Sequence, residues 1–397
     1  MDKKELKILI TGSTLIGNKG ALAMFLSVQR ILSNTLKDFN LTFSILTPYS
    51  SKNVKSIAKY NYKIYSYENL AKKFNIFSFI KNNFLAIKAY IDCDLVVDIS
   101  GISYCDSDSF FSTTINRSLF IIPALLFRKP FINFTQSFGP IKKPLTKTIA
   151  RIFLNKCSLT IPREKKSKEC LEKIGVRNNM VVCIDSAFGM EAETPDFFKK
   201  EKLTIGICPS EVVDSRSEEY AVLVAKIIDF LIENVEAKII IVPHYSKPSQ
   251  DIKRTNIFND DFSVASKIIN ISKHKKEILF LKQDFTPPEL KGIIGSCDAF
   301  IGSRYHALIA SISMSVPSIA IGWSYKYDEF FKMAGIEEYS LSFKDLDYET
   351  LKKKTLKLLK QRKLIEERLT RNHEKLLESS YKAGEIVKEF IVNHVRT

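Results

Sequence analysis

The stretch from Asp298 to Gly322, DAFIGSRYHALIASISMSVPSIAIG, constrains the fold more than any other part of the chain. Ala299–Ile301 has the continuous apolar character of a buried strand, and a helix is expected from Ser303 to about Ser313. A second apolar strand is expected over Pro317–Ile321. Strand, helix and strand in so short a stretch make a βαβ unit, and such a unit requires a parallel sheet.

Charged and titratable side chains lie where the first of these strands meets its helix. Arg304 and His306 fall in the first turn, where free N–H groups and the helix dipole favour an anion. Ligands of parallel sheets bind beyond the carboxyl ends of the strands. The pattern therefore predicts a site for a phosphate or carboxylate with a proton-transfer group beside it. The alternative is structural: Arg304 pairs with a nearby acid, and His306 is a half-buried histidine of the core.

Apolar strands alternate with helices along most of the remaining chain. The expected strands are Leu6–Thr11, Leu41–Thr47, Tyr62–Ser66, Leu95–Ile99, Phe131–Thr135, Ser158–Ile161, Val181–Ile184, Leu203–Cys208, Lys238–Val242 and Ile278–Leu281. A chain of 397 residues is too long for one hydrophobic core. We therefore expect two doubly wound, Rossmann-like α/β domains, residues 1–190 and 203–345, which face each other across a cleft. Residues 191–202 break the pattern as a linker would, and 346–397 are expected to form basic helices that pack back on the body.

The composition limits the class of partner and the compartment. A net charge of +16 suits an anionic partner: a phosphorylated small molecule, an anionic membrane surface or nucleic acid. The seven cysteines are scattered and include no CxxC pair, which predicts reduced, buried thiols and no metal site. The chain enters its first strand without a signal peptide, and its longest apolar run, Leu119–Phe127, is too short to span a bilayer. We therefore expect a cytoplasmic protein.

Two stretches leave open a peripheral contact with the inner membrane face. Phe74–Ile91 is rich in Phe, Ile and Lys at helical spacing, which fits a core-facing helix and, less well, a membrane-facing one. The helical tail from Tyr348 to Phe390 has a strongly basic face, which is either solvated or in contact with anionic lipid headgroups.

Further candidate residues follow other expected strands. Asp106 comes after the strand Leu95–Ile99 and is either an active-site acid or a helix cap. Arg163 lies at a strand-to-helix junction like that of Arg304. The glycine-rich turn Gly12–Gly20 resembles a phosphate-binding loop, although it matches neither GxGxxG nor GxxxxGKS/T.

Six short motifs follow one another along the chain. They are SGISYCDS at 100–107, TQSFGP at 135–140, PREKKS at 162–167, DSAF at 185–188, VPH at 242–244 and SRYHALIAS at 303–311. In this order and spacing they resemble the polysaccharide pyruvyl transferase family, whose fold is similar to that of the two-domain GT-B glycosyltransferases. The resemblance runs from the turn Asn18-Lys19-Gly20 to Lys326. The chain departs from the family in the loop Ser100–Tyr104, which has one glycine where several are usual, and at Ser186, where proline is usual.

This resemblance implies a reaction and a set of site residues. The pyruvyl group of phosphoenolpyruvate would be transferred onto two hydroxyls of a sugar in a cell-surface glycan or its precursor, forming a cyclic ketal and releasing phosphate. The catalytic residues implied are His306, Asp106 and Arg304. The donor-binding residues are Arg304, Arg163, Ser303, His244 and Lys326, and those on the acceptor side are Asn18, Lys19, Gly20 and Gln136. The general acid is either His306 or His244, and Asp106 would accept the proton of the sugar hydroxyl.

Neither a resident cofactor nor a metal is expected, and the saccharide acceptor is either free or lipid-linked. The runner-up function is a GT-B glycosyltransferase that uses a nucleotide sugar. A function from another class is a basic module that binds nucleic acid or membrane through the +16 charge. Because no nucleic-acid-binding motif is present, nucleic acid is not expected as a partner. The sequence does not specify the sugar, the ketal stereochemistry or the oligomeric state.

Overall fold

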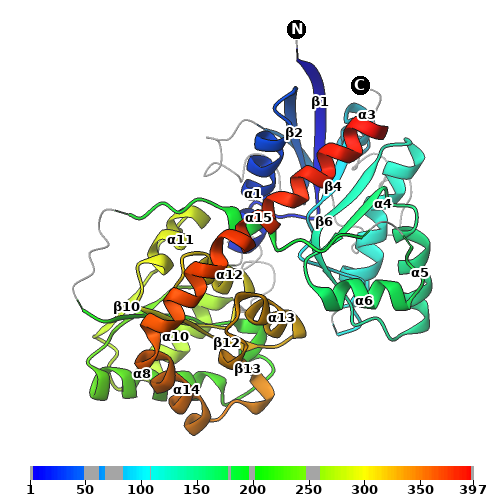
Figure 1. The fold of residues 1–397 in the computed structure, drawn as a ribbon. Coiled ribbons are helices and arrows are strands. Elements are labelled where there is room, and N and C mark those ends of the chain that lie inside the picture. Colours follow the sequence, from blue (N-terminus) through cyan, green and yellow to red (C-terminus); the bar gives the residue numbers. More distant parts are fainter. Residues whose placement is uncertain are drawn as a thin grey trace. The chain divides into compact units, whose positions relative to one another are not determined.

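The computed structural model describes residues 3–48, 62–67, 84–107, 109–177, 180–195, 202–246 and 260–394. The chain forms two compact units (Figure 1). The first comprises Met1–Ile16, Met24–Ser186 and Glu378–Thr397, and the second comprises Gly17–Ala23 and Ala187–Leu377. Residues 74–83 of the helix expected at Phe74–Ile91, and 196–201 of the expected linker, lie outside the described residues.

The first unit is built on a seven-stranded parallel sheet of order β3-β2-β1-β4-β6-β5, with β7 beside β6. Its strands are β1 Lys4–Thr11, β2 Phe39–Thr47, β3 Lys63–Ser66, β4 Leu95–Asp98, β5 Ile102–Ser103, β6 Phe131–Phe138 and β7 Leu159–Pro162. Its helices include α1 Lys19–Thr35, whose first residues belong to the second unit, α3 Phe84–Asp92, α4 Asn116–Leu126, α5 Pro144–Leu154 and α6 Lys165–Lys173. Every residue of β6 is buried, as a parallel strand covered on both faces should be.

Two features of the first unit differ from the pattern expected from the sequence. Val181–Ile184 does not form a strand and only lies beside β7, through the bridge of Met180 to Thr160 and a bond from the Cys183 N–H to the Pro162 carbonyl. The bounds of helices α4 and α5 were not predicted, and only the capping alternative for Asp106 implied a helix after it. These two helices pack, with α3, against β1, β4 and β6 in one apolar cluster that includes Val96, Phe131 and Leu154.

The second unit holds a six-stranded parallel sheet of order β10-β9-β8-β11-β12-β13. Its strands are β8 Thr204–Cys208, β9 Lys238–Ile241, β10 Ile278–Phe280, β11 Ala299–Gly302, β12 Ser318–Gly322 and β13 Ser340–Ser342. Its helices are α7 Glu211–Asp214, α8 Tyr220–Val235, α10 Asp261–Ile271, α11 Pro287–Gly295, α12 Tyr305–Ser313, α13 Tyr325–Ala334 and α14 Tyr348–Lys360, followed by α15 Arg362–His394, whose residues from Glu378 belong to the first unit. The βαβ unit predicted from Asp298–Gly322 is present as β11, α12 and β12, with Phe300 beside Ser318.

Both sheets share one topological property that locates their ligand-binding edges. The strand order reverses between β1 and β4 in the first unit and between β8 and β11 in the second. In doubly wound sheets ligands bind beyond the carboxyl ends of the strands at such a reversal. The loops that follow these strands are therefore where each unit is expected to hold its functional side chains.

Arg163 organises the carboxyl edge of the first sheet. Its side chain is 1% exposed and follows directly after β7. Its Nη1 forms an ion pair with Asp185, its Nε donates to Glu164 at 2.9 Å and to the Ser137 hydroxyl at 2.7 Å, and its Nη2 donates to the Gly101 carbonyl at 2.7 Å. One guanidinium thus connects its own segment to strand β6 and to the loops at Gly101 and Asp185, and it neutralises two fully buried carboxylates.

Replacing Arg163 by methionine is expected to destabilise the protein by about 3–5 kcal/mol, because Glu164 and Asp185 would stay buried without their cation. Urea denaturation followed by far-ultraviolet circular dichroism measures this change. Lys168→Met is the matched control, because its ion pair with Glu172 spans 3.7 Å on the surface and should contribute less than about 1 kcal/mol. Equal stabilities of the two variants would contradict a structural role for Arg163.

Candidate functional site

The carboxyl edge of the second sheet gathers cationic and titratable side chains. His244 follows β9, Arg304 and His306 follow β11, and Lys326 follows β12. Lys19, at the start of α1, belongs to the same unit. Parallel strands bring their ends to one edge, so residues from distant parts of the sequence meet there.

Asp261 holds together three loops at this edge, those after β8, β9 and β11. It is the first residue of α10 and is completely buried. Its carboxylate accepts the backbone N–H of Glu211 at 3.1 Å, after β8, and that of His244 at 3.3 Å, after β9. The same carboxylate binds Arg304, after β11, through Nε at 2.9 Å and Nη2 at 2.6 Å.

The bidentate pairing fixes how Arg304 presents its remaining donors. Asp261 occupies the edge formed by Nε and Nη2, so Nη1 points away from that carboxylate. The guanidinium carbon also lies 5.3 Å from the centre of the Tyr245 ring, a cation–π contact. The acid partner that the structural alternative required is therefore present, and it orients the guanidinium rather than enclosing it on every side.

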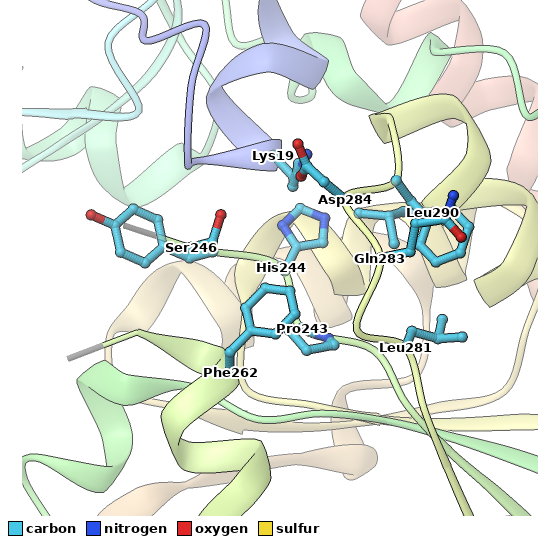
Figure 2. Close-up of a pocket in the computed structure, with 11 residues that line it drawn as sticks. Lys19, Pro243, His244, Ser246, Phe262, Leu281, Gln283, Asp284 and Leu290 are labelled. Carbon is cyan, nitrogen blue, oxygen red and sulfur yellow. The ribbon is translucent and has the colours of Figure 1, made fainter. Parts of the chain in front are cut away.

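The His244 side chain is buried close to Arg304 and Lys19. It lines a pocket together with Lys19, Tyr245, Asp284 and other residues of the same unit, and Figure 2 shows it between Lys19 and Pro243. Burial, followed by the nearby His306, Arg304 and Lys19, lowers the pKa of His244 well below its ordinary value. The imidazole is therefore neutral at pH 7 when no anion is bound.

His306 lies against the backbone of the α1 segment. It is in the first turn of α12, and its ring meets that of Tyr305 edge to face at 5.6 Å. A Cβ atom added to Gly20 would overlap the Nδ1 and Cγ atoms of His306. Position 20 must therefore be glycine for this close approach of backbone to imidazole.

The segment Asn18–Gly20 is attached to the second unit by several contacts. The Lys19 N–H donates to the His244 carbonyl at 3.2 Å, and Nζ contacts the Asp284 carboxylate at 2.5 Å. Asn18 pairs with Tyr245 in an antiparallel bridge, and its side chain accepts the Ala21 N–H at 3.2 Å, as an N-cap does. The sequence grouped this segment with Asp106 and Arg163, whereas the structure places it with His244 and His306. Its contact with an acceptor stays a prediction.

Lys326 and Ser303 complete the set of predicted donor-side residues in this unit. Lys326 is 8% exposed, and its ammonium lies 4.6 Å from the Trp323 ring and 5.2 Å from the Tyr305 ring. Ser303 is bonded through its hydroxyl to Tyr220 at 2.7 Å, and its carbonyl accepts the Tyr327 hydroxyl at 3.0 Å. Aromatic side chains thus hold the loops after β11 and β12 in place.

Three predicted site residues belong to the first unit: Asp106, Gln136 and Arg163. Asp106 accepts the Lys142 and Lys143 N–H groups and the Thr146 hydroxyl at the start of α5, which is the arrangement of a cap. Burial of Asp106 acts to raise its pKa, but these hydrogen bonds outweigh it and lower the pKa, which weakens this carboxylate as a base.

The other two first-unit residues are part of the buried network of that sheet. Gln136 is fully buried, donates to the Asp98 carboxylate at 2.5 Å and accepts the Ser103 hydroxyl at 2.8 Å. Arg163 binds Glu164 and Asp185 as described above. Roles of these two residues in binding substrate stay predictions.

Sequence reasoning missed three residues of the second unit that shape the site: Asp261, Tyr245 and Asp284. Tyr245 and Asp284 follow β9 and β10, so the rule that located His244 could have found them. Asp260 and Asp261 precede an apolar helical run, which signals a cap, and Asp260 does accept the Ser263 N–H at 2.9 Å. No local pattern distinguishes the capping aspartate from the one that binds Arg304.

Comparison with known proteins defines the class of this chain. The family described as polysaccharide pyruvyl transferase matches residues 18–325, so the chain belongs to that family. It is 23% identical over 278 residues to the amylovoran biosynthesis protein AmsJ of Erwinia amylovora, covering 62% of this chain and 65% of AmsJ. The chain therefore spans less than two thirds of the length of this curated relative.

Solved structures of other proteins have the same architecture. The UDP-GlcNAc 2-epimerase of Neisseria meningitidis bound to UDP-GlcNAc is similar with a TM-score of 0.58 at 11% identity, over 98% of this chain and 100% of that one. MurG of Acinetobacter baumannii is similar with a TM-score of 0.52 at 12% identity, over 97% and 99%. These likenesses show the fold, which is that of the GT-B glycosyltransferases and epimerases, as predicted. None of the described helices is long and apolar enough to cross a lipid bilayer.

Replacing Asp261 by asparagine is expected to destabilise the second unit by about 3–5 kcal/mol, because Arg304 would lose its buried counter-charge while the side-chain size stays the same. Trp323 is the single tryptophan of the chain and belongs to this unit, so its fluorescence during urea denaturation reports the change. The control is Asp214→Asn, whose partner Lys267 is 46% exposed and whose loss should cost less than about 1 kcal/mol. Unchanged stability of Asp261→Asn would show that the carboxylate does not organise this edge.

Proposed function

We propose that this member of the polysaccharide pyruvyl transferase family transfers the pyruvyl group of phosphoenolpyruvate onto two hydroxyls of a sugar unit. The observation that carries the proposal is the convergence of Arg304, Lys19 and Lys326 with two histidines at one sheet edge. Phosphoenolpyruvate bears a phosphate and a carboxylate on adjoining positions, so a site for it needs several cations and a proton donor. The family membership and the kinship with AmsJ support a saccharide of a polysaccharide as the acceptor.

The reaction balances without a further reagent. Carbon C3 of the enol gains a proton and becomes a methyl group, and C2 becomes electrophilic. Two sugar oxygens form bonds to C2, and the bond between C2 and the phosphate oxygen breaks. One of the two hydroxyl protons replaces the one delivered to C3, and the other leaves with inorganic phosphate. The product is a cyclic ketal of pyruvate.

Arg304 is suited to the donor because its orientation is fixed before the donor arrives. The Asp261 carboxylate and the Tyr245 ring hold the guanidinium, and its Nη1 group is directed away from Asp261. A preoriented cation loses little side-chain entropy on binding an anion. The start of α12 adds backbone N–H groups, and Lys326 adds a second positive charge from the first turn of α13.

The proton for C3 comes from His306 or His244. His244 is neutral in the empty site, because burial, followed by the nearby His306, Arg304 and Lys19, lowers its pKa. A trianionic or dianionic donor offsets these positive charges and raises that pKa, so donor binding itself would charge His244. Such coupling would confine the protonated imidazole to the complex in which it is needed.

On the acceptor side, Asp106 is the proposed proton acceptor for the sugar hydroxyl. Its three hydrogen-bond donors weaken it as a base, so it serves best where C2 is already electrophilic. Asp106→Asn is expected to lower turnover while leaving donor affinity unchanged, which phosphate release and calorimetric titration measure separately.

The function is tested by phosphate release from phosphoenolpyruvate across a panel of sugars and lipid-linked saccharides. Release that depends on the acceptor, together with a product in which pyruvate is held as a ketal, is the expected result. Thermal stabilisation by UDP- or CMP-sugars and not by phosphoenolpyruvate would point instead to glycosyl transfer and would overturn the proposal.

Arg304→Lys is expected to weaken phosphoenolpyruvate binding about 10- to 100-fold. Lysine keeps the positive charge beside Asp261 but lacks the planar guanidinium, which can bind Asp261 and the donor at the same time. Isothermal titration calorimetry gives the dissociation constant. The control is Arg371→Lys, an exposed arginine of α15 in the same unit. Donor affinity of Arg304→Lys equal to that of the control would remove Arg304 from the donor site.

Phosphoenolpyruvate binding near pH 7 is expected to take up a proton at His244, and affinity should fall as the pH rises. The sign follows from a pKa that is well below neutrality in the free protein and higher in the complex. Titrations in two buffers of different ionisation enthalpy count the protons, and subtracting the count for His244→Gln removes protons that belong to the ligand. Identical counts for the two proteins would mean that His244 does not change its charge.

A further inference from the structure

The surface of the first unit carries exposed apolar side chains that the donor chemistry does not use. On α4, Ile122 and Leu126 lie one turn apart on the same face, and Leu126 is 73% exposed. On α5, Leu145 is 60% exposed and shares a face with Ile152, which is 48% exposed. Phe111 of the short helix η4, Phe111–Ile115, is also exposed. Solvent-facing positions of a surface helix normally hold polar residues, so this face needs an explanation.

These side chains belong to neighbouring elements. η4 continues directly into α4, and α5 packs against both of them. α4 precedes β6 and α5 follows it, so both helices run in the direction opposite to that strand and lie side by side. We refer to the outward faces of η4, α4 and α5 as the α4–α5 face.

The charge of this part of the chain has a single sign. From Ser109 to Pro162 the sequence contains no aspartate or glutamate. It contains eight basic residues in the same stretch: Arg117, Arg128, Lys129, Lys142, Lys143, Lys147, Arg151 and Lys156. Six of these eight are exposed, all but Arg117 and Lys129. On the exposed side of α5, Lys147 and Arg151 lie along one border and Leu145 and Ile152 along the other, about 130° apart around the helix axis, with Thr148 between them.

We propose that the α4–α5 face binds the surface of an anionic lipid bilayer. Apolar side chains flanked by lysine and arginine fit the boundary between acyl chains and negatively charged headgroups. A second copy of the chain would bring two strongly positive faces together and be repelled. Nucleic acid would pair with the basic residues but would leave the exposed leucines in water, because proteins contact nucleic acid mainly at its phosphates and sugars.

This surface is distinct from the basic helical tail that the sequence singled out. The tail carries its lysines on α14 and α15 in the midst of acidic residues such as Glu366 and Glu367. Helices η4, α4 and α5 contain no acids of their own, and Asp106 at the start of α5 offsets only part of the positive charge of the eight basic residues from Arg117 to Lys156. The inference needs neither phosphoenolpyruvate nor a sugar, and its failure would leave the proposed donor chemistry untouched.

The test is flotation of the full-length protein with vesicles of phosphatidylglycerol and phosphatidylcholine in equal parts, and with vesicles of phosphatidylcholine alone. The wild-type protein is expected to bind the anionic vesicles and to dissociate at high salt. Lys147→Glu with Arg151→Glu should weaken binding by at least about 25-fold, at about fivefold for each basic residue. Leu145→Ser with Ile152→Ser should weaken it by about tenfold or more, through lost apolar contact.

The matched control is Lys353→Glu with Lys360→Glu, two exposed lysines of α14 that change the net charge by the same amount. This variant should bind as the wild type does. The four single changes on α5 are at exposed positions, and thermal melting verifies that both α5 variants are folded. Absence of wild-type binding, equal losses in the α5 charge variant and the α14 control, or full binding by the serine variant would each overturn the proposal.

Discussion

The bidentate bond between Asp261 and Arg304 is the interaction on which the candidate site depends. One buried carboxylate accepts the N–H groups that follow β8 and β9 and the guanidinium that follows β11, so three loops keep one geometry. It also supplies the negative charge that allows Arg304 to remain beside His244, His306 and Lys19. Without this carboxylate the buried guanidinium would have no counter-charge at low dielectric, where an unpaired ion is costly. The Asp261 carboxylate therefore both fixes the loops at this edge of the sheet and orients the arginine of the candidate anion site.

The two units share a topology but differ in the charge that they bury at the carboxyl edge. In the first unit, Arg163 forms ion pairs with Glu164 and Asp185. The Asp98 carboxylate accepts hydrogen bonds from Thr11, Ser100 and Gln136. In the second, cations predominate. The buried acids of the first edge are paired within the protein, whereas an edge rich in cations attracts phosphate and carboxylate. This difference supports a donor on the second unit in the transfer that we propose.

The sequence predicted the strands well wherever a continuous apolar run ended in a polar loop, as at β1, β4, β8 and β11. The strand prediction was wrong at Val181–Ile184, where apolar residues are buried in the core without forming the hydrogen bonds of a sheet. α4 was missed because its apolar residues lie all around the helix and give no amphipathic period. α5 carried a usable signal, because Pro144 occupies its first turn. Asp106 was weighed as acid or cap, and its bonds to α5 are those of a cap.

The sequence alone determined the parallel α/β fold, the family and the short list of residues after β9, β11 and β12, because hydrophobic period and motif order are local properties of the chain. Only the tertiary structure decided which acid binds Arg304 and which protein groups surround His244. It also placed Gly20 against His306, within the second unit. Those contacts join residues far apart in sequence, and long-range pairing depends on how the strand ends converge, which no local pattern records.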